Sequence, residues 1–278
     1  MKRLFKLIGR VFQYYNYKQI PIASAALCYY MTMTVFPLII CLYTLLGNNY
    51  SQAMQILSFA EGFLSHDTID TIGTFLNYVA NNHSMGMAVA GVTVLVTSAS
   101  AGVRSMQVTI GRLQGGPRYP GIGGFIFSLF FAVVFLAATW FAILVLFTSR
   151  GLLELLNTKI PFLDISGSWY WFKYVLLAVI MFLFIWVIYR VSRKKHMHYP
   201  IWPGAFLATV GIVATSLIFS AFIAVSARYS LVYGSLASVI LLMYWMYLIG
   251  QVIYIGAAFN VSLRDLRRAR HTAGKERA

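Results

Sequence analysis

Six long apolar runs constrain this chain more than any other feature. Each run is about as long as, or longer than, the roughly 20 residues that a helix needs to cross a bilayer core. Backbone polar groups in lipid must be satisfied within the segment, which favours helices. We therefore predict an all-α, polytopic membrane protein, with one membrane domain over residues 1–278. The predicted transmembrane helices are 22–46, 85–103, 122–148, 169–189, 201–227 and 231–263.

The composition excludes an ordinary soluble domain. Hydrophobic residues make up 60% of the 278 residues and charged residues 10%, yet the net charge is +15. A soluble nucleic-acid-binding protein is basic because it is rich in charge, which this chain is not. We therefore expect no specific nucleic-acid partner.

The basic residues set the predicted orientation. With both termini in the cytoplasm, 18 of the 22 Lys and Arg residues fall on the inner side. Every loop then obeys the positive-inside rule. We predict a multi-pass protein of the bacterial inner membrane with both ends in the cytoplasm. A homo-oligomer is compatible with this prediction.

Three segments outside the spans have patterns of their own. Residues 1–20 carry apolar and basic residues at helical spacing, which predicts a cytoplasmic amphipathic helix that lies on the leaflet, packs on the bundle, or does both. The first outer loop, 47–84, predicts two short amphipathic helices that act as a lid or as inert packing. Residues 264–278 form a basic cytoplasmic tail that attracts anionic lipid.

A glycine-rich loop follows the second span. The segment GRLQGGPRYPGIGG, Gly111–Gly124, has basic side chains at Arg112 and Arg118. Its backbone amides and arginines are suited to a phosphate or a lipid headgroup. A flexible connector that satisfies the positive-inside rule explains the same residues.

No constellation of residues predicts catalysis. The two clustered histidines, His196 and His198, lie in a basic run without a nearby carboxylate. A two-metal nuclease needs convergent carboxylates, and the predicted cytoplasmic side holds only Asp265 and Glu276. We therefore expect neither an enzyme nor a metal or other cofactor.

The polar residues in the predicted spans are mostly uncharged. Pro37 removes one helical hydrogen bond and predicts a hinge in the first span. Arg104 and Gln107 lie where the second span meets the inner interface, and Gln251 and Asn260 lie in the last span. These side chains line a substrate cavity, or they cross-link helices as amides in membranes often do.

Two segments at the ends of the chain resemble a known family. ALCYYMTMTVFPLI, Ala26–Ile39, resembles the first span of the YihY/BrkB membrane-protein family, whose older name is ribonuclease BN. The segment Tyr233–Asn260 resembles the last span of that family, and the matching positions are Tyr233, Gly234, Trp245, Gly256 and Asn260. One position departs from the pattern: Ala258 stands where the family commonly has an acidic residue, so no role for that carboxylate carries over.

The resemblance implies an integral inner-membrane protein with six spans. The family has no settled biochemical function, and proposals for it lean toward envelope or lipid transport. Its ribonuclease name is a poor match for a chain that lacks metal ligands.

Our leading hypothesis is a transporter or flippase-like protein for a lipid or another amphipathic anion. The spans carry few charges, and the basic inner loops are suited to an anionic headgroup on the cytoplasmic side. In this hypothesis Arg104 and Arg112 contact the headgroup, and Gln107, Tyr233, Gln251 and Asn260 line the cavity. The alternative is a non-transporting scaffold that binds envelope-synthesis or division partners. A genuine ribonuclease is the third and least supported hypothesis.

Overall fold

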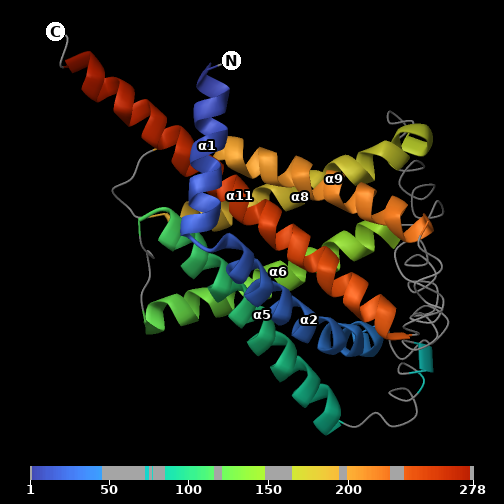
Figure 1. Cartoon of the computed structure of the whole chain (residues 1–278). Helices are drawn as coiled ribbons and strands as arrows, with labels where there is room; N and C mark the ends of the chain where they lie inside the picture. Colours follow the sequence, from blue (N-terminus) through green and yellow to red (C-terminus); the bar gives the residue numbers. More distant parts are fainter. Residues whose placement is uncertain are drawn as a thin grey trace.

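The computed structural model describes residues 2–45, 73–74, 77, 85–115, 121–147, 165–193, 199–225 and 235–275. Its elements in these ranges are all α-helices, and none is a strand (Figure 1). They are α1 (Lys2–Tyr17), α2 (Ile20–Leu45), α5 (Met85–Leu113), α6 (Ile122–Phe147), α8 (Ile165–Ser192), α9 (Trp202–Val225) and α11 (Ser235–Lys275).

The predicted fold class is confirmed. Five helices, α5, α6, α8, α9 and α11, are long and apolar enough to cross a membrane. The remaining predicted span, 22–46, corresponds to α2, a helix of 26 residues that includes the shorter apolar stretch Ile20–Val35. At 1.5 Å per residue α2 is about 39 Å long, which exceeds the thickness of a bilayer core. The two amphipathic helices expected in the first outer loop fall almost entirely outside the described residues.

Two helices extend well beyond the apolar runs that predicted them. The run 85–103 is the start of α5, which continues to Leu113 through a polar and basic stretch. The run 231–263 is the main part of α11, which continues to Lys275. The segment predicted as a separate tail, 264–278, is therefore mostly the end of a long helix. Hydropathy marks the part of a helix that lies in lipid, whereas helical hydrogen bonds continue into the interface.

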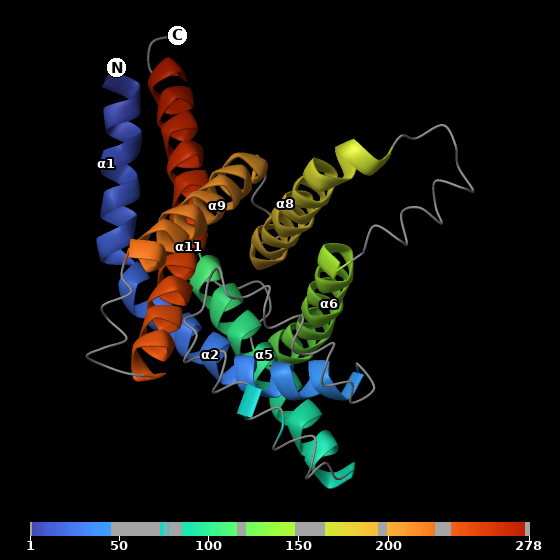
Figure 2. The same cartoon turned by 90° about the vertical axis from the view of Figure 1, so that its right-hand side faces the viewer.

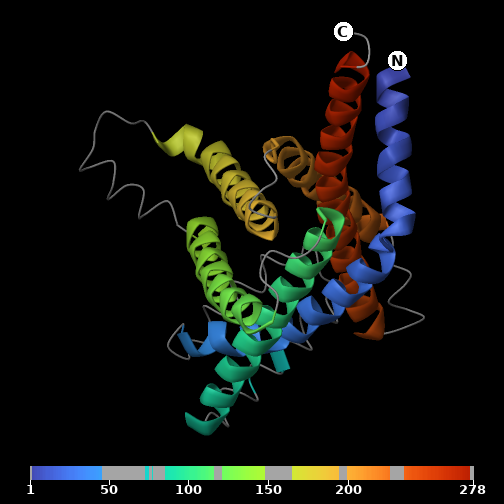
Figure 3. The same cartoon turned by 90° about the vertical axis from the view of Figure 1, so that its left-hand side faces the viewer.

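The first helix packs against the last one. The start of α1 and the end of α11 lie on the same side of the molecule in every view (Figures 1 and 3). The Tyr14 hydroxyl donates a hydrogen bond of 2.6 Å to the Asp265 carboxylate, and the Tyr15 hydroxyl donates one of 2.8 Å to the Gln251 side chain. An adjacent face of α1 leaves an apolar stripe exposed, formed by Phe5, Ile8 and Phe12. The helix therefore has one face that packs on the bundle and an exposed apolar face that suits the membrane interface.

Small residues bring α9 and α11 into close contact. A Cβ atom on Gly256 would lie 2.6 Å from the Gly204 carbonyl oxygen and 2.9 Å from the Ala208 Cβ. The side chain of Asn260 joins the two helices at the same level. Its oxygen accepts a hydrogen bond of 2.7 Å from the Gly204 amide, and its nitrogen donates one of 2.8 Å to the Ile201 carbonyl. Such contacts suit a bilayer, where packing rather than hydrophobic burial joins helices.

Aromatic contacts join α6 to α8, and α2 contains a proline. The α6 and α8 helices are neighbours (Figure 2). They meet through aromatic rings, with the Phe184 ring centroid 5.3 Å from that of Phe131 and 4.8 Å from that of Phe135. Pro37 is buried inside α2, which is continuous on either side of it. Its role as a hinge stays a prediction.

Candidate functional site

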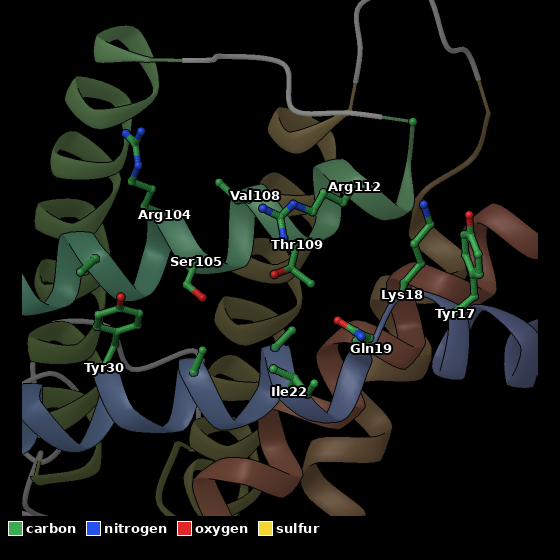
Figure 4. A pocket seen from close by; sticks show the side chains of 14 residues that line it. Tyr17, Lys18, Gln19, Ile22, Tyr30, Arg104, Ser105, Val108, Thr109 and Arg112 are labelled. Carbon is green, nitrogen blue, oxygen red and sulfur yellow. The ribbon is translucent and has the colours of Figure 1, made fainter.

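A cleft of about 890 Å³ lies between α2 and α5, next to the turn that joins α1 to α2 (Figure 4). Its walls combine cationic, hydroxyl-bearing and small apolar side chains. The residues that line it are Tyr17, Lys18, Gln19, Ile22, Ala23, Ala26, Tyr30, Ala101, Arg104, Ser105, Val108, Thr109, Arg112 and Gly115.

The turn between α1 and α2 brings Lys18 to the cleft. The Lys18 amide bonds to the Tyr14 carbonyl at 3.0 Å, which closes the last turn of α1. Gln19 then adopts a left-handed backbone with φ of 52°, a conformation that commonly ends helices. The α2 helix begins at once with Ile20 and Pro21. A proline at this position is compatible with the helix, since its first-turn amide would have no partner within the helix. The position of Lys18 is thus fixed by a two-residue connection.

One face of α5 supplies most of the polar wall. Arg104, Ser105, Thr109 and Arg112 lie at relative positions 0, 1, 5 and 8, so that they follow one side of the helix over about two turns. Figure 4 shows Ser105 and Thr109 turned toward α2, with Lys18, Arg104 and Arg112 along one rim. The cleft therefore has a cationic rim and a floor that carries hydroxyl groups.

Arg104 also connects the cleft to the start of α6. Both terminal nitrogens of its guanidinium donate to the Gly121 carbonyl at 3.3 Å. Gly121 has a positive φ of 68° and precedes the first residue of α6. These are long bonds to a neutral acceptor, whereas bonds from a guanidinium to a phosphate are shorter and about twice as strong. An anion in the cleft would therefore compete well for this side chain.

The structure brings two of the predicted site residues together and places the others elsewhere. Arg104 and Arg112 both line the cleft. The Gln107 oxygen accepts a hydrogen bond of 3.1 Å from the Ser128 hydroxyl of α6. Gln251 bonds to α1, and Asn260 is fully buried between α9 and α11. These three amides join helices, as the cross-linking alternative described. Tyr233 lies outside the described residues.

Several residues of the cleft escaped the prediction. Lys18 falls in the predicted interfacial segment 1–20, and Ser105 and Thr109 were not singled out as site residues. The signal that marks the last two is their spacing from Arg104 and Arg112 on one helical face. No comparable signal exists for Lys18, because its approach to α5 depends on how α2 packs.

Charge in the cleft has one sign. Lys18, Arg104 and Arg112 are its cations, and no carboxylate stands among the described residues that line it. Asp265, the one acidic residue in the described ranges, lies away from this cleft and pairs with Arg264 at 2.9 Å. Within the same ranges, no three His, Cys, Asp or Glu side chains gather as metal ligands. The arrangement can hold a phosphate through its rim and an apolar group along its alanine residues.

A family model described as "Virulence factor BrkB" matches residues 11–278 of the chain. The chain belongs to the BrkB family. A Bacillus subtilis (strain 168) protein named "Putative ribonuclease-like protein YfkH" is 25% identical over 253 residues, which covers 88% of this chain and 90% of that protein. No solved structure matches the chain.

Three of the residues that carry the BrkB resemblance lie at contacts between helices. The Trp245 indole nitrogen of α11 donates to the Ser216 hydroxyl of α9 at 3.3 Å. Gly256 and Asn260 form the close contact with Gly204 described above. Ala258, at the position that is commonly acidic in the family, is fully buried. This part of the last span thus joins α11 to α9.

Proposed function

We propose that this BrkB-family membrane protein is a transporter or flippase-like protein that binds an anionic lipid in the cleft between α2 and α5. The observation that carries the proposal is the cationic rim beside an apolar wall. Lys18, Arg104 and Arg112 offer charge to a phosphate, and the exposed Ile22 leaves an apolar path beside them. An amphipathic anion is the ligand class that uses both.

The arginines are suited to a phosphate in particular. A guanidinium presents paired N–H donors that match two phosphate oxygens, while a lysine acts as a mobile point charge. The combination tolerates a headgroup that changes position as it moves. With the orientation expected from the positive-inside rule, the cleft faces the cytoplasmic leaflet of the inner membrane.

The proposal is tested with purified protein in phosphatidylcholine vesicles that contain a fluorescent phosphatidylglycerol. Leaflet exchange is followed by quenching the outer label. We expect exchange well above protein-free vesicles, and the R104Q/R112Q variant to reduce the initial rate about 10- to 100-fold, since a hydrogen bond to a charged group contributes about 1.5–3 kcal/mol.

The matched control is R267Q/R268Q, which removes two exposed charges from the end of α11 outside the cleft. It should keep the wild-type rate. Exchange at the protein-free rate for a broad panel of lipids contradicts the proposal and favours the scaffold alternative. In that case stable partner proteins should co-purify with the chain.

A further inference from the structure

A buried hydroxyl group stands behind the floor of the cleft. The Tyr254 side chain of α11 is fully buried. Its hydroxyl faces the side chains of Ser105 and Thr109, yet it closes no hydrogen bond of normal geometry. A polar group without a partner is costly in a membrane protein, where water is scarce. The Tyr254 hydroxyl is therefore a donor that a reorientation of the Ser105 or Thr109 side chain could satisfy.

Ser105 and Thr109 connect this hydroxyl to the cleft. They lie one helical turn apart on α5 and both line the cleft. We call Ser105, Thr109 and Tyr254 the hydroxyl cluster. Each hydroxyl can donate one hydrogen bond and accept others. A ligand hydroxyl that binds Ser105 or Thr109 can reorient their hydroxyl groups toward Tyr254, so that all three hydroxyls have hydrogen-bond partners.

The cleft is poorly suited to an amine. An ammonium group needs a carboxylate or several neutral acceptors, and the described lining supplies three cations and no acid. The nearest available carboxylate in the described ranges, Asp265, is already bonded to Tyr14 and Arg264. An ethanolamine headgroup would therefore place its positive charge beside Lys18, Arg104 or Arg112.

We propose that the cleft selects phosphodiester lipids whose headgroup carries hydroxyls and no amine, and that Tyr254 determines this selection. The inference rests on the proposed function and names its substrate class. The phosphate binds at the cationic rim, and the hydroxyls of a glycerol or an inositol headgroup bind to the hydroxyl cluster. Tyr254 acts behind Ser105 and Thr109 as a positioning residue for the headgroup.

The test compares lipids that differ in one group. Phosphatidylglycerol and phosphatidylinositol carry hydroxyls, phosphatidylethanol has the same phosphodiester charge without them, and phosphatidylethanolamine adds an amine. Binding of each lipid to the full chain in detergent is titrated by native mass spectrometry. We expect at least one hydroxylated lipid to bind about 5- to 10-fold more tightly than phosphatidylethanol, and phosphatidylethanolamine to bind most weakly.

Tyr254→Phe removes the hydroxyl and keeps the ring. It should bring the preference for the hydroxylated lipid over phosphatidylethanol close to one, while phosphatidylethanol binding stays unchanged. The lipid-free Tm should be equal or higher, because the variant loses a buried group without a partner. Thr109→Val removes a second hydroxyl at similar volume and should weaken the same preference.

Ser262→Ala is the matched control, since Ser262 is another buried hydroxyl of α11 without a partner and lies outside the cleft. It should keep the wild-type preference. Equal binding of the hydroxylated lipids and phosphatidylethanol overturns the inference, as does a preference that survives both Tyr254→Phe and Thr109→Val. Lipid exchange that is intact but unselective would leave the proposed function standing. No binding or exchange of any lipid would overturn both.

Discussion

The side chain of Asn260 in α11 caps the start of α9 through its contact with Gly204. Its oxygen accepts a 2.7 Å hydrogen bond from the Gly204 amide, one of the amides at a helix N-terminus that lack a partner within the helix. Its nitrogen bonds to the Ile201 carbonyl, which precedes the helix. A single side chain thus does across two helices what an N-cap residue does within one.

Asn260→Ala should lower the stability of the bundle. The substitution leaves the buried Gly204 amide without its acceptor, at a cost of about 1–3 kcal/mol. The check is the Tm in detergent, with Ser262→Ala as the comparison, because its buried hydroxyl has no partner to lose. Equal Tm values for the two variants would mean that the cap contributes nothing.

Gly256→Ala should be destabilising for a steric reason. The added Cβ would lie 2.6 Å from the Gly204 carbonyl oxygen and 2.7 Å from the Tyr189 hydroxyl oxygen. Overpacking of this kind costs about 1–3 kcal/mol. Gly123→Ala adds the same atom in α6 with nothing within 4 Å, and should keep or raise the Tm by removing a helical glycine. A Gly256→Ala protein as stable as Gly123→Ala would contradict the close contact.

The attachment of α1 to α11 should weaken at high pH. Burial, together with the hydrogen bond and negative charge of Asp265, raises the pKa of Tyr14 above its usual value of 10.0. A raised pKa favours the neutral form in the folded state, so the Tyr14 contribution is full below pH 10 and is lost as pH rises through the folded-state pKa.

A nitroxide at position 13, on an exposed side chain of α1, reports this change by electron paramagnetic resonance. Its mobility should stay constant from pH 6 to 9 and should increase above about pH 10. In Tyr14→Phe the mobility should already be higher at pH 8, and the Tyr14-dependent step should disappear. A wild-type profile without any step, or the same step in Tyr14→Phe, would contradict the assignment.

The predicted orientation is open to chemical labelling. Both native cysteines, Cys28 and Cys41, are buried, so that an impermeant maleimide should give low background. Arg268→Cys should react only when the cytoplasmic side is accessible, and Asp67→Cys should react from outside in intact cells. Reaction of both positions from the same side would refute the six-span topology with cytoplasmic ends.

Hydropathy predicted the transmembrane helices because lipid requires mostly apolar side chains along the whole of each span. The run 122–148 appears as α6 with one residue of difference, since it is apolar throughout. The run 85–103 stopped ten residues early, because Arg104 and Arg112 interrupt the apolar pattern while their helix continues. By hydropathy alone these two arginines lie beyond the end of the span. The structure places them on a face of the continuing helix that is directed toward α2.

The candidate site was only half predictable, for a similar reason. Arg104 and Arg112 stand out in the sequence as cations near a span. Lys18 joins them only because a two-residue turn starts α2 beside α5, and Tyr254 lies behind Ser105 only because α11 packs against α5. These proximities come from packing between helices, which periodicity within one helix does not encode.

The most direct test of the central claim is the affinity of the purified chain for phosphatidylglycerol with and without the cationic rim. The variant K18Q/R104Q/R112Q removes the three cleft charges, and K6Q/R267Q/R268Q removes three exposed charges elsewhere. Binding is titrated for both by native mass spectrometry. We predict that the first variant loses at least 10-fold in affinity, while the second stays within about twofold of wild type. Equal losses in the two variants would show that the chain binds anionic lipid through its overall charge, and would contradict a binding site in the cleft.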